Sequence, residues 1–249
     1  MLFRSSDPKT YVSFSLREKY ETHEIHVDVS LVDNELLDMD GFRAWRPDFA
    51  DAKFLTETVE HAGNKLEVYR VGHAVEKMSK SLFNVVNPDR VCDEYGADTL
   101  RLFEMFLGPL EASKPWNSDG IIGITRFLKR LWKLGREHVA AGVVAPYSGG
   151  ELNASQKELR FKLHSTIQKV TDDYGRRLQF NTAIAAVMEL LNTYDKADTS
   201  GDVGRAVAQE VLEAAVLLLA PIVPHVTDAL WSGLKPGTEL LAQAWPQVD

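Results

Sequence analysis

The stretch Lys77-Met78-Ser79-Lys80-Ser81-Leu82-Phe83-Asn84-Val85-Val86-Asn87-Pro88 separates two parts of the chain that have different patterns. Before it, apolar residues recur at every second position in short runs, and after it they recur at helical spacing. Its first five residues place two ammonium groups and two hydroxyls in one short polar segment. Such a loop can hold a polyphosphate, because an oriented cation stabilises negative charge that develops in a transition state. The alternative for these five residues alone is an ordinary solvated loop.

Residues 1–75 are predicted to form short strands and loops. Glu24–Leu31 and Lys65–Val71 alternate apolar and polar side chains, which is typical of half-buried strands. Gly63-Asn64 offers a tight turn just before the second of these strands. The segment Trp45–Ala52 between them has no regular period, so no element is predicted there.

From Asn87 onward the pattern predicts helices. Asn87 suits a helix cap and Pro88 the first helical position, and Gly96 and Gly108-Pro109 suit the ends of two successive helices. Further helices are expected to begin at Asn117 or Ser118, at a capping box in Ser155–Glu158, at Asn181 and near Val203, with a short last segment through Trp231. The fold class predicted from this pattern is mainly α, an antiparallel helix bundle preceded by a small α/β segment.

Composition restricts the class of protein. The chain has 249 residues, of which 45% are hydrophobic and 26% charged, as in an ordinary soluble globular protein. The net charge of −8 means that any RNA contact must come from a local basic patch. The single cysteine, Cys92, excludes an internal disulfide and a multi-cysteine zinc site. No signal peptide is recognisable, and the longest apolar stretch, Ala214–Val223, is too short to span a bilayer, so we expect a cytoplasmic protein.

One predicted helix carries a basic stripe, which is a second candidate site. The cations that fall on one side of it are Arg126, Lys129, Arg130, Lys133 and Arg136. About 150° away, at about 100° per residue, lie Ile121, Ile124, Leu128, Leu131 and Trp132. The stripe is either a solvated helix face opposite the core or a set of phosphate contacts. Arg176 and Arg177 are a weaker candidate for the same kind of surface.

Other features are interpreted as structural. His23 and His26 lie in a strand pattern and are expected at a sheet surface, so no metal site is predicted. Trp116, Trp132 and Trp231 are expected to be core or helix-contact residues and not base-stacking platforms. The acidic residues form no acid–base constellation.

The Lys/Ser loop and the segments that follow it resemble leucyl-tRNA synthetase, a class I aminoacyl-tRNA synthetase. The pentapeptide 77–81 is similar to the signature loop of the class. The other similar segments are Tyr95–Leu110, Ser113-Lys114-Pro115-Trp116-Asn117, Gly120–Gly123, Arg126–Leu128, Arg130–Trp132, Phe180–Ala185, Met188–Asn192, Leu219–His225 and Leu230-Trp231. The segments Gly108–Glu111 and Lys114–Asn117 are closer to the leucyl enzyme than to its valyl, isoleucyl or methionyl relatives.

The resemblance is strong from about residue 70 to the C-terminus, and it implies a division of the chain. Residues 1–75 would be the end of a catalytic region with the leucyl-specific insertion, and 76–112 the signature loop with stem-contact helices. Residues 113–249 would be a bundle of the anticodon-binding type. None of the seven histidines lies in a His-Ile-Gly-His-type motif, and no glycine-rich nucleotide-binding turn is present. We therefore expect a C-terminal part of the enzyme that is inactive by itself.

The resemblance also assigns chemistry to residues. The parent enzyme activates leucine with ATP, assisted by Mg²⁺, and transfers it to tRNA. Lys77 and Lys80 would stabilise charge on the departing pyrophosphate, Ser79 and Ser81 would donate hydrogen bonds, and Met78 would anchor the loop by packing. Phe83 stands where the family usually has a glycine, so the closing geometry of the loop is expected to differ.

Leucine tRNA is the partner implied for the bundle, through the basic stripe and through shape and backbone contacts rather than base readout. The N-terminal catalytic and editing domains would be the other partners of a monomeric enzyme, with no bound metal and no membrane contact in this part. The alternative is a stand-alone RNA-binding or interaction module derived from a synthetase.

Overall fold

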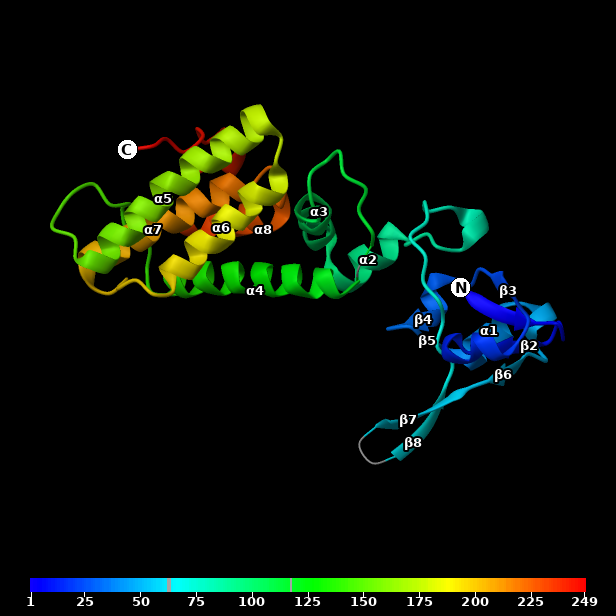
Figure 1. Ribbon diagram of the computed structural model, residues 1–249. Helices are drawn as coiled ribbons and strands as arrows, with labels where there is room; N and C mark the ends of the chain where they lie inside the picture. The colour runs from blue at the N-terminus through cyan, green and yellow to red at the C-terminus, as the bar shows by residue number, and fades with distance from the viewer. Residues whose placement is uncertain (62–63, 117) are drawn as a thin grey trace. The chain divides into compact units, whose positions relative to one another are not determined.

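The computed structural model describes residues 1–61, 64–116 and 118–249, and it divides into two compact units, 1–87 and 88–249. The first unit holds short strands and one short helix, and the second is built from helices (Figure 1). The predicted fold class, a mainly α protein with a small α/β segment before the bundle, is confirmed.

The first unit contains a small mixed sheet. Its four strands lie in the order β3-β1-β2-β6, in which β1 pairs antiparallel with β2 and β3, and β2 pairs parallel with β6. The bounds in this sheet are β1 Leu2–Ser5, β2 Thr10–Val12, β3 Thr22–Ile25 and β6 Lys53–Leu55. The other elements are β4 Val32–Asp33, β5 Leu36–Leu37, helix α1 Met39–Trp45, β7 Glu57–His61, β8 Asn64–Val68, and 3-10 turns at Phe14–Lys19, Val29–Leu31, Pro47–Phe49 and Lys80–Leu82.

The core of this unit is aromatic. Phe42 of α1 is fully buried, and its ring lies 5.2 Å from Tyr11 and 4.5 Å from Phe49, centroid to centroid. The hydroxyl of buried Tyr69 donates to the carbonyl of Val12 at 2.7 Å, so the packed ring also meets its hydrogen-bonding need. Burial raises the pKa of Tyr69. The segment 45–52, for which no element was expected, therefore supplies part of the core.

Both predicted strands of the first unit are shorter than expected. The strand predicted at Glu24–Leu31 ends at Ile25, and Val29–Leu31 forms a 3-10 turn in which the carboxylate of Asp28 accepts from the amide of Ser30. The strand predicted at Lys65–Val71 is β8, which ends at Val68 and pairs with β7 in a two-stranded ribbon that extends from the small sheet (Figure 1). The predicted turn at Gly63-Asn64 includes a residue outside the described ranges.

The second unit is a set of helices that run up and down beside one another (Figure 1). Their bounds are α2 Pro88–Tyr95, α3 Ala97–Phe106, α4 Ser118–Ala140, α5 Ala154–Asp172, α6 Phe180–Tyr194, α7 Gly201–Leu219 and α8 Pro224–Leu234. A π-helical turn at Asp173–Arg177 follows α5, and a 3-10 turn at Leu240–Ala242 follows α8. The predicted helix ends near Gly96 and Gly108 are confirmed.

Helix α7 lies inside the bundle. Twelve of its residues are buried, from Gly204 to Leu219, and it packs against α5, α6 and α8. Its apolar surface extends nearly all round its C-terminal half, as its sequence predicts. The helices around it bury one face each and expose the other, so an amphipathic helix such as α4 must present its polar side outward.

Helix starts show where local patterns mislead. The capping box expected at Ser155–Glu158 lies two residues earlier, because Asn153 caps α5 and exchanges hydrogen bonds with Gln156 at 3.0 Å each. Asn181, the expected cap of α6, lies inside its first turn, which begins at Phe180. For α4, the expected start at Asn117 falls outside the described residues, and the helix begins at Ser118.

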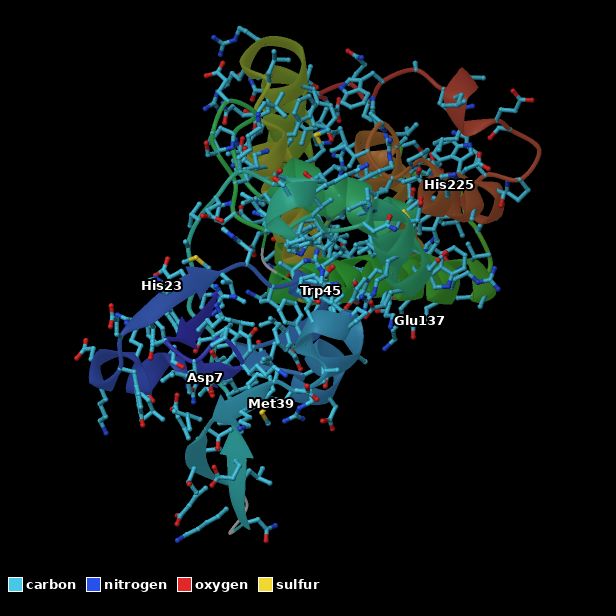
Figure 2. All side chains as sticks on the ribbon, turned by 90° about the vertical axis from the view of Figure 1, so that its right-hand side faces the viewer. Asp7, His23, Met39, Trp45, Glu137 and His225 are labelled. Carbon is cyan, nitrogen blue, oxygen red and sulfur yellow. The ribbon has the colours of Figure 1, made fainter. Side chains whose placement is uncertain are left out.

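Charged side chains connect the helix ends within this unit. Asp98 of α3 accepts from the amide of Val226 at 2.7 Å and so caps the start of α8, next to His225 (Figure 2). Arg101 donates to the carbonyls of Ile222 and Pro221 at the end of α7. These contacts satisfy backbone groups that a helix end leaves unpaired.

A buried polar cluster holds the end of α4 against α7. His138 is 8% exposed, and its Nε2 donates to Oε1 of Gln209 at 2.7 Å. The amide nitrogen of Gln209 donates to Glu213 at 2.8 Å and to the carbonyl of Leu234 at 2.9 Å. Burial lowers the pKa of His138 below its ordinary value of 6.5, because a charged ring would lose its solvation there.

We predict that His138 makes the bundle less stable at acidic pH. The pKa of His138 is lower in the folded chain than in the unfolded chain, so the neutral ring stabilises the fold at pH values above the unfolded pKa. This stability decreases as the pH falls below the unfolded pKa, because the unfolded chain then binds the extra proton. Between about pH 7.5 and about pH 5.5, the free energy of urea unfolding should decrease less in His138→Gln than in the unchanged chain. An equal decrease in both proteins would contradict this role of His138.

Candidate functional sites

The Lys/Ser loop at 77–81 belongs to the first unit and is stabilised by local hydrogen bonds. The amide of Ser79 donates to Oδ1 of Asn84 at 2.7 Å, and Nδ2 of Asn84 donates to the carbonyl of Lys77 at 3.3 Å. The hydroxyls of Ser79 and Ser81 lie 2.9 Å apart. One asparagine side chain thus bridges the two sides of the loop, which is the local bonding that this residue type favours.

Lys77 and Lys80 carry the charge of the loop. Both side chains are exposed, and over the described part of the chain neither side chain has a hydrogen bond or an ion pair. The backbone beside them is held by Asn84, and the ammonium groups are available to an anion. A cation without an acidic partner keeps its full field for a ligand, which an internal ion pair would cancel.

One expectation about the loop is corrected. Met78 was expected to anchor the loop by packing, but it is 45% exposed. The packing contact belongs to Phe83, which is half-buried and which closes the 3-10 turn with φ 54° and ψ 27°. That is the left-handed region, which glycine occupies at the least cost. The sequence departs from the family's glycine here, and the backbone keeps a conformation that a glycine would adopt.

The basic stripe lies on α4, and the structure places four of its five cations on the exposed side, Arg126, Lys129, Lys133 and Arg136. We refer to these four as the basic face. Over the described residues, the side chains of Arg126 and Lys129 have no hydrogen bond or ion pair. Lys133 lies 3.7 Å from Glu137, which is labelled on α4 in Figure 2, in an exposed pair of the kind that contributes little.

Arg130 differs from the other members of the stripe. Its Nη1 donates to Oδ1 of Asn192 at 2.7 Å, and its Nη2 lies 2.7 Å from a carboxylate oxygen of Asp195. Both partners lie at the C-terminal end of α6, where a cation also meets the negative end of the helix dipole. The guanidinium is therefore engaged in joining α4 to α6.

Trp132 was expected with the apolar residues of α4, as a core or helix-contact residue, and the structure places it outside the core. Ile121, Ile124, Leu128 and Leu131 are buried, but Trp132 is 39% exposed. The guanidinium carbon of Arg136 lies 5.8 Å from the centre of its ring. At about 100° per residue Trp132 lies about 40° from Arg136 around the helix, so it borders the basic face. Trp231, by contrast, is 1% exposed as predicted.

Arg176 and Arg177, the weaker basic candidate, are paired with nearby carboxylates. Arg176 forms a two-point pair with the carboxylate of Asp172, at 2.6 and 2.9 Å. Arg177 donates to Asp173 at 2.9 Å, and Lys169 donates to the same buried carboxylate at 2.8 Å. These arginines hold the turn after α5 and are less available to a phosphate than the basic face.

His23 and His26, which both belong to the first unit, have different surroundings. His23 lies exposed on β3, and His26 lies 2.8 Å from Glu76, which precedes the Lys/Ser loop. No group of three His, Cys, Asp or Glu residues within the described ranges could hold a metal ion.

No helix among the described residues has the length and apolar character to cross a membrane.

Two family models match the chain, one on each side of α4. Residues 71–113, which include the Lys/Ser loop, match tRNA synthetases class I (I, L, M and V). Residues 156–249, which include α6 to α8 and most of α5, match the anticodon-binding domain of tRNA ligase. The chain therefore belongs to the class I tRNA synthetases and carries an anticodon-binding domain.

Similar curated proteins identify the kind of tRNA synthetase to which the chain is related. A leucine–tRNA ligase of Chromobacterium violaceum is 75% identical over 175 residues, which are 70% of this chain and 20% of that protein. A leucine–tRNA ligase of Bacteroides thetaiotaomicron is 41% identical over 248 residues, which are 100% of this chain and 24% of that protein. The chain is thus a segment of the leucine–tRNA ligase family, and it spans about a quarter or less of the length of these curated relatives.

A solved structure agrees with this placement. The chain is similar to a crystal structure of the ternary complex of Agrobacterium radiobacter K84 AgnB2 LeuRS, tRNA and LeuAMS, with a TM-score of 0.63 and 30% identity. The match covers 70% of this chain and 23% of that one.

The sequence did not reveal every residue that shapes the sites. Asn84, Trp45 and Arg46 all touch the loop or its end, and none was a candidate. An asparagine in a polar loop tends to bond to nearby backbone groups, and this general tendency is the local signal that Asn84 offered. The contacts of Trp45 and Arg46 cross a long stretch of sequence and have no local pattern.

Proposed function

We propose that this chain supplies two working parts of a leucine–tRNA ligase, the loop that binds the phosphates of ATP and a helical face that binds leucine tRNA. The reaction would activate leucine with ATP to leucyl-adenylate and pyrophosphate, and then transfer leucine to tRNA. The observation that carries the proposal is the pair Lys77 and Lys80, exposed and without an acidic partner over the described residues, on a loop held by Asn84. The names of the relatives support the same reaction and do not favour a stand-alone module.

Lys77 and Lys80 would act on the β- and γ-phosphates. Negative charge builds on the departing pyrophosphate as the adenylate forms, and two ammonium groups aimed at it lower the barrier. The hydroxyls of Ser79 and Ser81, which lie 2.9 Å apart, would donate to phosphate oxygens, with Mg²⁺ as the usual companion of the nucleotide. The N-terminal catalytic and editing domains of a monomeric parent would be the partners of this chain, and the catalytic domain would hold the adenine and the leucine.

The basic face of α4 would contact the tRNA backbone. The net charge of the chain is −8, so most of its surface does not attract a polyanion. The four exposed cations of the basic face form a local attractive surface on α4. Long flexible lysines and arginines on a straight helix suit phosphates better than base edges. Recognition through shape and backbone is therefore the mode that these residues support.

We predict that the basic face sets the salt dependence of tRNA binding by this chain. The slope of log affinity against log salt decreases by about 0.7 to 0.9 for each phosphate that is no longer neutralised, so Lys129→Gln with Lys133→Gln should lower it by about 1.5. Fluorescence anisotropy with a leucine tRNA transcript across a salt series measures the slope. The matched control is Lys157→Gln with Lys196→Gln, two exposed lysines elsewhere in the bundle, with the same change in net charge.

The control pair should leave the slope unchanged. Equal effects of both pairs would mean that only net charge matters and would contradict a defined tRNA face. Arg130→Gln should weaken binding less than Arg126→Gln, because the side chain of Arg130 is engaged with α6.

We predict that Lys80 is required for activation in an assembled enzyme. The corresponding segment of the Bacteroides thetaiotaomicron ligase, which aligns with 248 residues of this chain, can be replaced by the chain to give a hybrid enzyme. Lys80→Ala should lower leucine-dependent ATP–pyrophosphate exchange by roughly 100-fold or more, since it removes one cation aimed at developing charge. Affinity for tRNA should not change.

The control for this experiment is Lys65→Ala, which removes an exposed cation of β8 in the same unit. It should retain exchange within about twofold, the size expected of a surface change. Exchange that survives Lys80→Ala, or a hybrid with the unchanged chain that shows no exchange, would contradict the proposed function.

A further inference from the structure

Phe83 occupies a backbone conformation that is costly for its residue type. It ends the 3-10 turn Lys80–Leu82 with φ 54° and ψ 27°, and its amide donates to the carbonyl of Lys80 at 3.3 Å. A residue with a Cβ has a higher free energy in the left-handed region, and the conformation persists only where surrounding contacts outweigh that cost. The contacts of Phe83 are therefore informative about the loop.

The ring of Phe83 supplies these contacts. It meets the indole of Trp45 edge-on, with the centroids 4.9 Å apart and the planes at 88°. The guanidinium carbon of Arg46 lies 4.6 Å from the centroid of each of these two rings. Both geometries are favourable, because the ring edge and the cation each meet the negative face of a neighbouring ring.

Trp45 connects this contact to the core of the first unit. It is the last residue of α1, where Figure 2 labels it, and its ring lies 6.1 Å from buried Phe42 and 5.8 Å from Phe49. The backbone adds a further link, since the carbonyl of Phe83 accepts from the amide of Val29 at 3.0 Å. The downstream end of the Lys/Ser loop is thus attached to the core by a ring, a cation and a backbone bond.

The upstream end of the loop is held less firmly. Residues 72–79 form no helix or strand, and Val75 is 86% exposed. Glu76 lies 2.8 Å from His26, in an ion pair that is partly open to solvent. The two ends of the loop therefore differ in how strongly they are fixed.

We propose that Phe83, docked on Trp45 and Arg46, is a positioning residue that fixes the downstream end of the Lys/Ser loop and so orients Lys77 and Lys80 toward phosphate. The inference rests on the proposed function for its ligand, but the docking itself is a property of this chain. A loop with one fixed end can close over a ligand by moving its free end, and its cations lose less freedom on binding. A glycine at this position would adopt the same backbone without the anchor.

The test measures amide exchange by NMR in the 249-residue chain. The reporters are the amides of Ser79, Leu82 and Val29, which donate to Asn84, Ser79 and Phe83 respectively. Phe83→Gly should raise their exchange rates by about fivefold, the size of an aromatic pair with a cation, while amides of β1 and β2 do not change. Trp45→Leu should also raise these exchange rates, and Phe83→Tyr, which keeps a ring at this position, should leave them unchanged.

A matched control lies in the same unit. The guanidinium carbon of Arg17 lies 3.9 Å from the ring centre of Phe14, in another aromatic–arginine contact that is far from the loop in sequence. Phe14→Ala should leave the exchange of Ser79 and Leu82 unchanged. Unchanged exchange in Phe83→Gly, or an increase spread equally over β1 and β2, would overturn the proposal.

Inorganic tripolyphosphate separates this inference from the proposed function. Titration calorimetry should show binding by the unchanged chain, abolition by Lys77→Ala with Lys80→Ala, and about a fivefold loss of affinity in Phe83→Gly. Unchanged affinity in Phe83→Gly would overturn the orienting role. If the unchanged chain does not bind tripolyphosphate, the phosphate role of the loop fails, and the exchange rates still decide whether Phe83 anchors it.

Discussion

Burial of helix α7 is the constraint on which the helical unit depends. Its nearly continuous apolar surface must be covered on all sides, and α5, α6 and α8 lie against it. The covering helices need only one apolar face, so their other faces carry polar and charged residues. The basic face of α4 follows from this arrangement, because Ile121, Ile124, Leu128 and Leu131 turn inward and direct the cations outward.

The first unit uses a different principle to present the Lys/Ser loop. A four-stranded sheet this small cannot bury much aliphatic surface, and its core is built instead from large rings such as Tyr11, Phe42 and Tyr69. The same aromatic cluster extends through Trp45 to Phe83 at the end of the loop. Lys77 and Lys80 are thereby left exposed, while the backbone beside them is attached to packed residues. A preorganised anion site would require this combination of exposed cations and a fixed backbone.

The helices and the basic stripe could be predicted because both depend on periodicity within one segment. The left-handed conformation of Phe83 could not, since its cost is offset by Trp45 and Arg46, far away in sequence. For the same reason the exposure of Trp132 and the pairing of Arg130 were not foreseen: spacing places a residue on a helix side, but the neighbouring helix decides whether it is covered. The segment 45–52 lacks a period because Trp45 ends α1 while Phe49 lies in a 3-10 turn, so their rings come from two different local structures.

The most direct measurement of both sites is the acetylation of lysines in the hybrid enzyme, read by mass spectrometry with ATP or tRNA added. We expect ATP with Mg²⁺ to protect Lys77 and Lys80, and leucine tRNA to protect Lys129 and Lys133. Two exposed lysines outside the basic face, Lys157 and Lys196, should react as before in both cases. If ATP does not protect the loop, or if tRNA protects all exposed lysines equally, the proposed roles of the loop and the basic face are contradicted.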